Sequence, residues 1–390
     1  MRIAIDRNIP LAASAFRSLG DVLLLETPEI NRSAVKDADI LVIRSETKVD
    51  RELLAGSRVR FVVTATIGTD HIDLPYLESL GIGFANAPGS NANSVKEYVL
   101  AALLVLSMRS GFTLRGKTLG VVGVGNIGSK VVKMASDLGL TVLQNDPPLA
   151  RKTGQPQFVS LDDLMSADIL TLHVPLTRIG EDATYHLFDG RCIAAMKPGC
   201  ILINTARGAV VDTRALKDAL RQGHLSAAVL DVWEGEPSID AELLQLAALG
   251  TAHIAGYSVD GKVNAVRMIR EAVCKFLSNT STWDPGGELP PLEITSIHLD
   301  GSGGLEEMLH AAVRQCYDVE LDDRYLRGIL GIPPETRIPY FMKLRAGYRL
   351  RREFSTVRVE VPPGFESVRK AIDAIGFQQE PGKRESPCND

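Results

Sequence analysis

The fold is decided by residues 118–128, which read TLGVVGVGNIG. The first six of these residues are largely apolar and do not alternate with polar ones, as in a parallel strand that is buried on both faces. In the segment that follows, Val131, Met134, Ala135 and Leu138 recur at i, i+3, i+4 and i+7, which places one apolar stripe on a helix. The stretch therefore predicts a strand, a glycine-rich turn and an amphipathic helix.

The turn carries three glycines in the spacing GxGxxG. Gly123 makes the tight turn, Gly125 lets backbone N–H groups approach a pyrophosphate, and Gly128 lets the helix pack closely on the strand. The positive end of the helix then faces the phosphates. We predict a dinucleotide site here, with Asn126 and Ile127 among its contacts.

An acidic residue, Asp146, follows the next predicted strand, residues 141–145. A carboxylate at this place accepts hydrogen bonds from the ribose hydroxyls of adenosine and repels a 2′-phosphate, so we predict NAD rather than NADP. Arg151 and Lys152, close by in sequence, keep NADP open as an alternative. A structural turn followed by a surface Asp is the other alternative, which the full strand–turn–helix–strand context disfavours.

Outward from this motif, short β-rich runs alternate with helical patterns over the first 280 residues, which is typical of a doubly wound α/β fold. The expected strands are residues 2–5, 40–44, 61–65, 81–86, 118–123, 141–145, 169–173, 200–204 and 227–232. Residues 278–291, rich in Pro, Gly, Ser and Thr, indicate a linker. An α+β segment follows, with strands expected at 292–299 and 356–361 and helices at 305–317 and 366–375.

These patterns predict three domains. A crossing helix over residues 98–109 and the loop after the last strand of the dinucleotide domain suggest that residues 94–256 are inserted in a substrate domain made of residues 1–93 and 257–285. Residues 286–390 would form a third domain. The expected fold class is α/β, with a Rossmann domain inserted in a flavodoxin-like domain and an α+β C-terminal domain.

Composition excludes several classes of protein. With 43 basic and 48 acidic residues the net charge is −5, which argues against general nucleic-acid binding. The cysteines are odd in number and form no CxxC pair, so we expect neither a disulfide framework nor a metal site, and a reducing compartment. They are Cys192, Cys200, Cys274, Cys316 and Cys388. The N-terminus does not resemble a signal peptide, and the longest apolar run, residues 98–108, is too short to span a bilayer, so we expect a cytoplasmic protein.

Three polar groups follow later strands, where ligands bind in open α/β sheets. Arg207, in NTARG, has a guanidinium that suits a carboxylate, and His253 is a candidate general base. Glu236, before Pro237, is a carboxylate that could orient the imidazole. Taken singly, each has a plain alternative: a surface salt bridge for the arginine, a helix start for Glu-Pro, and a structural role for the histidine.

In order, the motifs GxGxxG, Asp, NTARG, DVWEGEP and HIAG resemble the D-2-hydroxyacid dehydrogenase superfamily. The resemblance implies that Arg207, Glu236 and His253 form the catalytic set, and that residues 172–177 form a loop on the cofactor side. It adds as cofactor contacts Val174, Ala206, Arg207, Asp231 and Gly256. One departure is Ala252, where most members carry Pro before the histidine; it loosens the loop and leaves the chemistry intact.

Residues 44–48, 64–71, 87–92 and 256–262 resemble, more narrowly, the branch of this superfamily that oxidises 4-phospho-D-erythronate to (R)-3-hydroxy-2-oxo-4-phosphooxybutanoate with NAD in pyridoxal 5′-phosphate biosynthesis. The implied substrate contacts are Ser45, Thr66 and Tyr257. Ser90, in place of Cys, and Val174, in place of Thr, depart from that branch, and Val174 puts one side-chain bond to the cofactor in doubt.

The last hundred residues resemble the dimerisation domain of the same branch, which implies a homodimer. The branch implies a small phosphorylated acid as substrate, and the net charge and short apolar runs lead us to expect neither nucleic acid nor membrane as a partner. Candidate cations for the substrate phosphate are Arg44, Lys48 and Lys262, each of which has solvated surface charge as its alternative. We also expect one or more of Arg349, Arg351 and Arg352 to approach the phosphate pocket of a partner subunit, or else to protect an exposed strand edge.

Two other functions remain as alternatives. A dehydrogenase of the phosphoglycerate type uses the same chemistry on an acid that is shorter by one hydroxymethylene. A dinucleotide-sensing corepressor shares the fold but requires a peptide groove and an extended regulatory tail, and the sequence shows neither.

Overall fold

The computed structural model describes residues 1–379, and the chain divides into two compact units. Unit 1 comprises Met1–Ala92 and Ser258–Pro291. Unit 2 comprises Asn93–Tyr257 and the chain from Leu292 onward. In the described part of the chain, no helix has the length and apolar character needed to cross a membrane. Cys388 lies outside the described residues.

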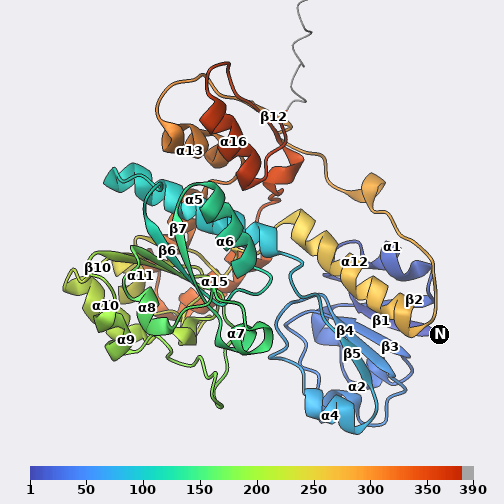
Figure 1. Cartoon of the computed structure of the whole chain (residues 1–390). Helices are drawn as coiled ribbons and strands as arrows, with labels where there is room; N and C mark the ends of the chain where they lie inside the picture. Colours follow the sequence, from blue (N-terminus) through green and yellow to red (C-terminus); the bar gives the residue numbers. More distant parts are fainter. Residues whose placement is uncertain (380–390) are drawn as a thin grey trace, which may run out of the picture. The chain divides into compact units, whose positions relative to one another are not determined.

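Unit 1 is a five-stranded parallel sheet in the order β2-β1-β3-β4-β5, which is the flavodoxin-like order (Figure 1). Its strands are β1 (Arg2–Asp6), β2 (Asp21–Leu25), β3 (Ile40–Ile43), β4 (Phe61–Thr64) and β5 (Gly83–Ala85). Its helices are α1 (Ala12–Arg17), α2 (Arg32–Val35), α3 (Arg51–Leu54), α4 (Leu74–Ser79) and α12 (Val259–Phe276). The sequence patterns missed β2, an edge strand whose run of leucines has no alternation.

Helix α12 covers one face of this sheet, although it comes from a distant part of the chain. Ser258 caps the helix by accepting a hydrogen bond from the N–H of Gly261 at 2.8 Å. Val266, Ile269 and Val273 are fully buried on its inner side, in one core with residues of β1, β3 and α1. Unit 1 is therefore built from two separate stretches of sequence.

Unit 2 contains a six-stranded parallel sheet in the order β11-β10-β9-β8-β6-β7. Its strands are β6 (Thr118–Val122), β7 (Thr141–Asn145), β8 (Ile169–Leu172), β9 (Cys200–Asn204), β10 (Leu225–Leu230) and β11 (Leu249–Gly250). An isolated bridge of Phe158 to Gln144 stands at the place of one more strand beside β7, which completes the order of a Rossmann fold. The topological switch point, where ligands bind in such sheets, lies between β6 and β8.

The helices of this part are α5 (Ala92–Ser110), α6 (Gly128–Asp137), α7 (Pro147–Thr153), α8 (Leu161–Leu164), α9 (Gly190–Ala195), α10 (Thr213–Arg221) and α11 (Ala241–Leu246). The predicted α/β class, with a Rossmann domain and a flavodoxin-like sheet, is confirmed.

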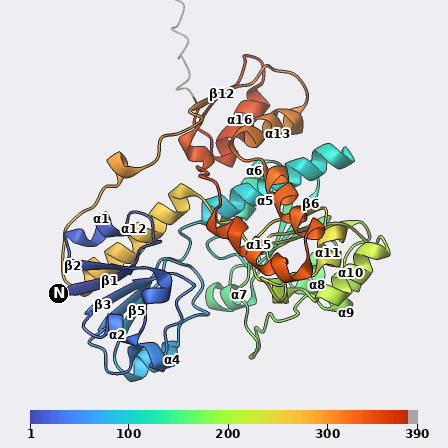
Figure 2. The ribbon, with the colours of Figure 1, turned by 180° about the vertical axis from the view of Figure 1, so that it is seen from behind.

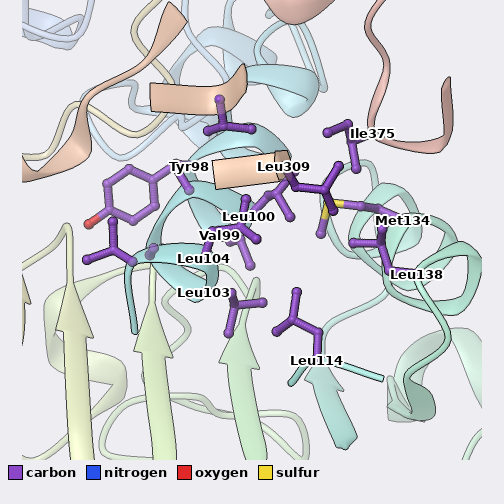
Figure 3. Packing of buried hydrophobic residues seen from close by; sticks show 14 of the residues in the cluster. Tyr98, Val99, Leu100, Leu103, Leu104, Leu114, Met134, Leu138, Leu309 and Ile375 are labelled. Carbon is purple, nitrogen blue, oxygen red and sulfur yellow. The ribbon is translucent and has the colours of Figure 1, made fainter. Parts of the chain in front are cut away.

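The C-terminal segment packs against the Rossmann part and shares its core. Its elements are β12 (Ser296–His298), α13 (Leu305–Cys316), α14 (Val319–Arg327), α15 (Pro334–Ala346), β13 (Arg358–Glu360) and α16 (Glu366–Ile375). Figure 3 shows Leu309 of α13 and Ile375 of α16 beside Met134 of α6, with Leu100 of α5 next to Leu309. Figure 2 shows the chain from behind, and in this view α15 lies on the near face of unit 2. The sequence patterns anticipated α13, α16 and both short strands, but not α14 or α15.

A buried ion pair fixes this segment to α5. Arg351 and Glu97 have side chains that are 0% and 2% exposed, and their N–O distance is 2.8 Å. The guanidinium also lies over the ring of Tyr317, 3.7 Å from its centroid. Arg349 pairs with Asp322 at 3.1 Å. The expectation that one or more of these arginines reaches a partner's phosphate pocket is therefore wrong for Arg351, because its charge is neutralised and enclosed within its own chain. For Arg349 and Arg352 it stays a prediction.

Candidate active site

The glycine-rich turn sits at the carboxyl end of β6, as the sequence predicts. Gly123 has φ +86°, a conformation that side chains rarely adopt. A Cβ at Gly128 would lie 1.9 Å from the carbonyl oxygen of Gly123, so only glycine lets α6 begin this close to the strand. A Cβ at Gly125 would meet nothing within 4 Å, so the backbone there faces open space. Among the described residues, no side chain caps α6. The turn therefore fits a pyrophosphate bound at a helix N-terminus.

Asp146 is fixed at the end of β7 by two backbone groups. Its Oδ2 accepts a hydrogen bond from the N–H of Val124 at 2.8 Å, and its Oδ1 accepts one from the N–H of Leu149 at 3.0 Å. The carboxylate therefore joins the glycine-rich turn to the start of α7. Each oxygen keeps a further lone pair, so the same carboxylate can accept hydrogen bonds from a ribose.

His173 follows β8, next to the glycine-rich turn, and it was not singled out from the sequence. Its two ring nitrogens lie 3.0 Å from the hydroxyl of Thr171 and 3.2 Å from that of Thr205. Burial lowers the pKa of His173 to about 3, so the ring is neutral at physiological pH. Val174 is adjacent to the same turn, because a Cβ on Gly123 would lie 2.8 Å from its Cγ1.

The loop that carries His253 is held by Asp231 at the end of β10. Asp231 is 2% exposed and accepts hydrogen bonds from the hydroxyl of Thr251 at 2.6 Å and from the N–H groups of Ile254 and Ala255 at 2.7 and 2.9 Å. Its carbonyl accepts a further bond from the N–H of His253 at 2.7 Å. The carboxylate is therefore committed to positioning the loop, and its predicted contact with the cofactor stays a prediction.

His253 and Glu236 form a hydrogen-bonded pair. His253 Nδ1 lies 2.5 Å from Glu236 Oε1, and both side chains are partly exposed. Since Nδ1 faces the carboxylate, Nε2 is the nitrogen left to exchange a proton. Burial alone would raise the pKa of Glu236, but the hydrogen bond to His253, the N–H of Trp233 and the charge of Arg345 together lower it. Glu236 is thus ionised at neutral pH and orients the imidazole.

Arg207 follows β9 on the same side of the sheet. Its carbonyl accepts a hydrogen bond from the side-chain amide of Asn204 at 3.0 Å, and its own Nη1 donates to the carbonyl of Ala206 at 2.8 Å. Arg207, Glu236 and His253 all come from loops that leave the carboxyl ends of β9, β10 and β11. The structure therefore places the three expected catalytic residues on one edge of the sheet of unit 2.

Tyr257, which follows Gly256, is held by aromatic and cationic neighbours from the C-terminal segment. Its ring meets the ring of Tyr348 edge-on with centroids 5.8 Å apart, and its hydroxyl lies 3.3 Å from Nη2 of Arg345. Tyr348 in turn donates its hydroxyl to Asp322 at 2.8 Å. Arg345 and Tyr348 were missed by the sequence analysis, because nothing in the pattern of residues 334–348 links them to a site ninety residues earlier.

Unit 1 carries the remaining predicted substrate contacts. The hydroxyl of Thr66 lies 2.7 Å from that of Thr64 and donates to the carbonyl of Gly68 at 3.1 Å. Ser45 follows β3 directly after Arg44, at the carboxyl edge of this sheet. Arg44 is engaged with Asp6 at 3.4 Å and with Glu46 at 3.0 Å.

The other two cations of unit 1 that the sequence proposed for the phosphate differ in their surroundings. Lys48 is 80% exposed and paired with Asp50 at 2.8 Å. Burial and the nearby charge of Arg44 lower the pKa of Lys262. A phosphate contact of these cations stays a prediction.

The Rossmann order, the glycine-rich turn and the His–Glu pair define an NAD-dependent oxidoreductase of the D-isomer-specific 2-hydroxyacid dehydrogenase class. Residues 100–255 match the family described as D-isomer specific 2-hydroxyacid dehydrogenase, NAD binding domain, and residues 288–376 match a domain of unknown function. The structure of D-lactate dehydrogenase from Aquifex aeolicus, complexed with NAD and lactic acid, is similar with a TM-score of 0.58 and 27% identity, over 71% of this chain and 96% of that chain.

Relatives of known name match almost the full length. Erythronate-4-phosphate dehydrogenase of Chromohalobacter salexigens is 46% identical over 97% of this chain and 98% of its own length. The enzyme of the same name from Cronobacter sakazakii is 44% identical over 97% and 98%. The chain belongs to the erythronate-4-phosphate dehydrogenase family, which confirms the resemblance drawn from the motifs.

Proposed function

We propose that this protein oxidises 4-phospho-D-erythronate to (R)-3-hydroxy-2-oxo-4-phosphooxybutanoate with NAD, as a step of pyridoxal 5′-phosphate biosynthesis. The observation that carries the proposal is the identity of 46% to a relative named for this substrate, sustained over 97% of the chain. The paired imidazole and carboxylate of His253 and Glu236 supply the acid–base group that the reaction needs.

Three residues of the chain would carry out the proton transfer and bind the substrate carboxylate. Nε2 of His253 accepts the proton of the C2 hydroxyl, and Glu236 stabilises the imidazolium that results. Arg207 binds the substrate carboxylate through two parallel hydrogen bonds. NAD, when bound, takes up the hydride that leaves C2.

The cofactor and substrate contacts are assigned as the motifs suggest. NAD would be held by the turn from Gly123 to Gly128, by Asp146, and by Val174, Ala206, Arg207, Asp231 and Gly256. Support comes from the open space at Gly125 and the orientation of Asp146 toward the turn. Ser45, Thr66 and Tyr257 would bind the substrate.

We also propose a function for each domain of the chain. Residues 1–93 and 257–285 form the substrate domain, residues 94–256 bind NAD, and residues 286–390 join two copies into a homodimer that works in the cytoplasm. Symmetric dimers are the commonest oligomers, which supports the last assignment.

The test is NADH formation by the purified protein with 4-phospho-D-erythronate and with 3-phospho-D-glycerate, measured side by side under identical conditions. The proposal predicts a much larger kcat/KM for phosphoerythronate. Equal values, or a larger value for phosphoglycerate, would contradict the assignment of the substrate and favour a dehydrogenase of the phosphoglycerate type.

A further inference from the structure

Arg345, on the last turn of α15, lies beside the catalytic residues of its own unit. Its Nη2 is 3.3 Å from the hydroxyl of Tyr257, and its guanidinium carbon lies 5.9 Å from the centroid of the same ring. Its charge is close enough to Glu236 to help lower the pKa of that carboxyl. A cation from the C-terminal segment therefore stands next to the pair of Glu236 and His253.

Unlike its neighbours along the chain, this arginine forms no ion pair among the described residues, and the carboxylate whose pKa its charge helps to lower, Glu236, is hydrogen-bonded to His253. Arg349 is paired with Asp322 at 3.1 Å, and Arg351 with Glu97 at 2.8 Å. Within the part of the chain that the structure describes, Arg345 has no carboxylate partner, and its Nε is buried without a hydrogen-bond acceptor. A partly buried guanidinium with an unused donor is costly unless an anion completes its hydrogen bonds.

The surroundings favour an anion from the substrate. A guanidinium offers a planar fork of donors that matches a phosphate with two parallel bonds. The carboxylate of the substrate is already assigned to Arg207, which leaves the phosphate as the second anion. Tyr257, which Arg345 contacts, is itself held in place by Tyr348 and through it by Asp322.

We propose that Arg345 binds the phosphate of the substrate and thereby sets the preference for a phosphorylated acid, an inference that rests on the proposed function. The C-terminal segment then contributes directly to substrate recognition in its own subunit.

The experiment compares Arg345→Gln with the wild type on two substrates, 4-phospho-D-erythronate and D-erythronate, which lacks the phosphate. A charged hydrogen-bonded contact of this kind is worth a factor of about 10 to 100. We expect kcat/KM for the phosphorylated acid to fall by that factor, mainly through KM, while kcat/KM for D-erythronate changes less than about threefold. Arg345→Lys should restore part of the loss, since an ammonium keeps the charge but not the fork.

Arg337→Gln is the matched control, because Arg337 lies on the same helix, is also partly buried, and donates, among residues 1–379, only to the carbonyl of Ile332 at 3.4 Å. This variant should have the same kcat/KM as the wild type for both substrates. The melting temperature and the affinity for NADH confirm that each variant is folded.

An equal fall for both substrates in Arg345→Gln would show that Arg345 only supports Tyr257, and an unchanged kcat/KM for the phosphorylated acid would also refute the proposal. Turnover of phosphoerythronate by the wild type tests the proposed function separately, since it does not depend on the variants.

Discussion

Replacing Asp146 with alanine should both destabilise the protein and change its cofactor preference. The same carboxylate binds two backbone N–H groups and is proposed to bind the ribose of NAD. Its two oxygens accept hydrogen bonds from the N–H groups of Val124 and Leu149, at 2.8 and 3.0 Å. Loss of the cap on α7 costs about 1 kcal/mol, and the N–H of Val124 left without its acceptor adds about 1 kcal/mol more. We expect the free energy of unfolding of Asp146→Ala to fall by about 2 kcal/mol in urea titrations.

Asp146→Asn separates the two roles. Asparagine caps helices as well as aspartate does, so its carbonyl oxygen should keep most of the stability. It lacks the negative charge, so it binds a ribose hydroxyl less strongly and no longer repels a 2′-phosphate. Loss of a charged hydrogen bond predicts that kcat/KM with NAD falls by about 10- to 100-fold, while the ratio of NADP to NAD rises.

The assay is the initial rate of NADH or NADPH formation over a range of each cofactor, for the wild type and both variants. An unchanged ratio in Asp146→Asn would refute the reasoning, because it would mean that the carboxylate does not face the ribose. If the ratio of NADP to NAD changes only in Asp146→Ala, the effect comes from a disordered turn and not from the loss of charge.

His253→Asn should lower kcat by about two to four orders of magnitude with little change in equilibrium binding of NAD, and near-normal turnover would mean that another group is the base. Glu236→Gln should lower kcat, since a neutral amide does not stabilise the imidazolium that forms on His253; an unchanged kcat would contradict the pairing. Burial lowers the pKa of His173 from 6.5 to about 3, so the unfolded chain binds its proton first and stability falls as the pH drops below 6.5. His173→Gln should therefore remove about 2 kcal/mol of the loss seen by urea unfolding between about pH 6.5 and 4.5, and parallel curves for both proteins would argue against a neutral buried ring. Truncation after Pro291 should uncover the apolar faces of α5 and α6 and give an aggregated product in sedimentation, whereas a soluble, active dimer would exclude the proposed role of the C-terminal segment.

The features that sequence alone predicts are those set by local rules. Gly123 is required by its own backbone φ of +86°, and Gly128 by the carbonyl of Gly123 five residues before it, so both requirements can be recognised from the local sequence. The carboxyl ends of parallel strands meet at one edge of a sheet, so the order of Arg207, Glu236 and His253 was enough to place them on one edge.

The features that sequence did not predict depend on contacts between distant segments. Helix α15 contains Pro339 and has no clear apolar stripe, so neither the helix nor the place of Arg345 could be predicted from its periodicity. From the sequence, Arg349 and Arg351 are expected to be exposed charges before a strand. Only the fold shows that Asp322 and Glu97 neutralise them. The role of Asp231 in holding the loop of His253 likewise depends on backbone groups 23 and 24 residues away.

The construction of unit 1 from two stretches of sequence has a consequence for the order in which the protein can fold on the ribosome. The strands β1 to β5 are complete by Ala85, but the face of the sheet that packs on α1 is covered in full only when α12, ending at Phe276, has been synthesised. Through the synthesis of nearly two hundred residues, the side chains on this face that α12 will bury stay uncovered. Translation at about 5 to 20 residues per second leaves them exposed for about ten seconds or more. The nascent chain is therefore most vulnerable to aggregation, and most in need of a chaperone, while its Rossmann part is being made.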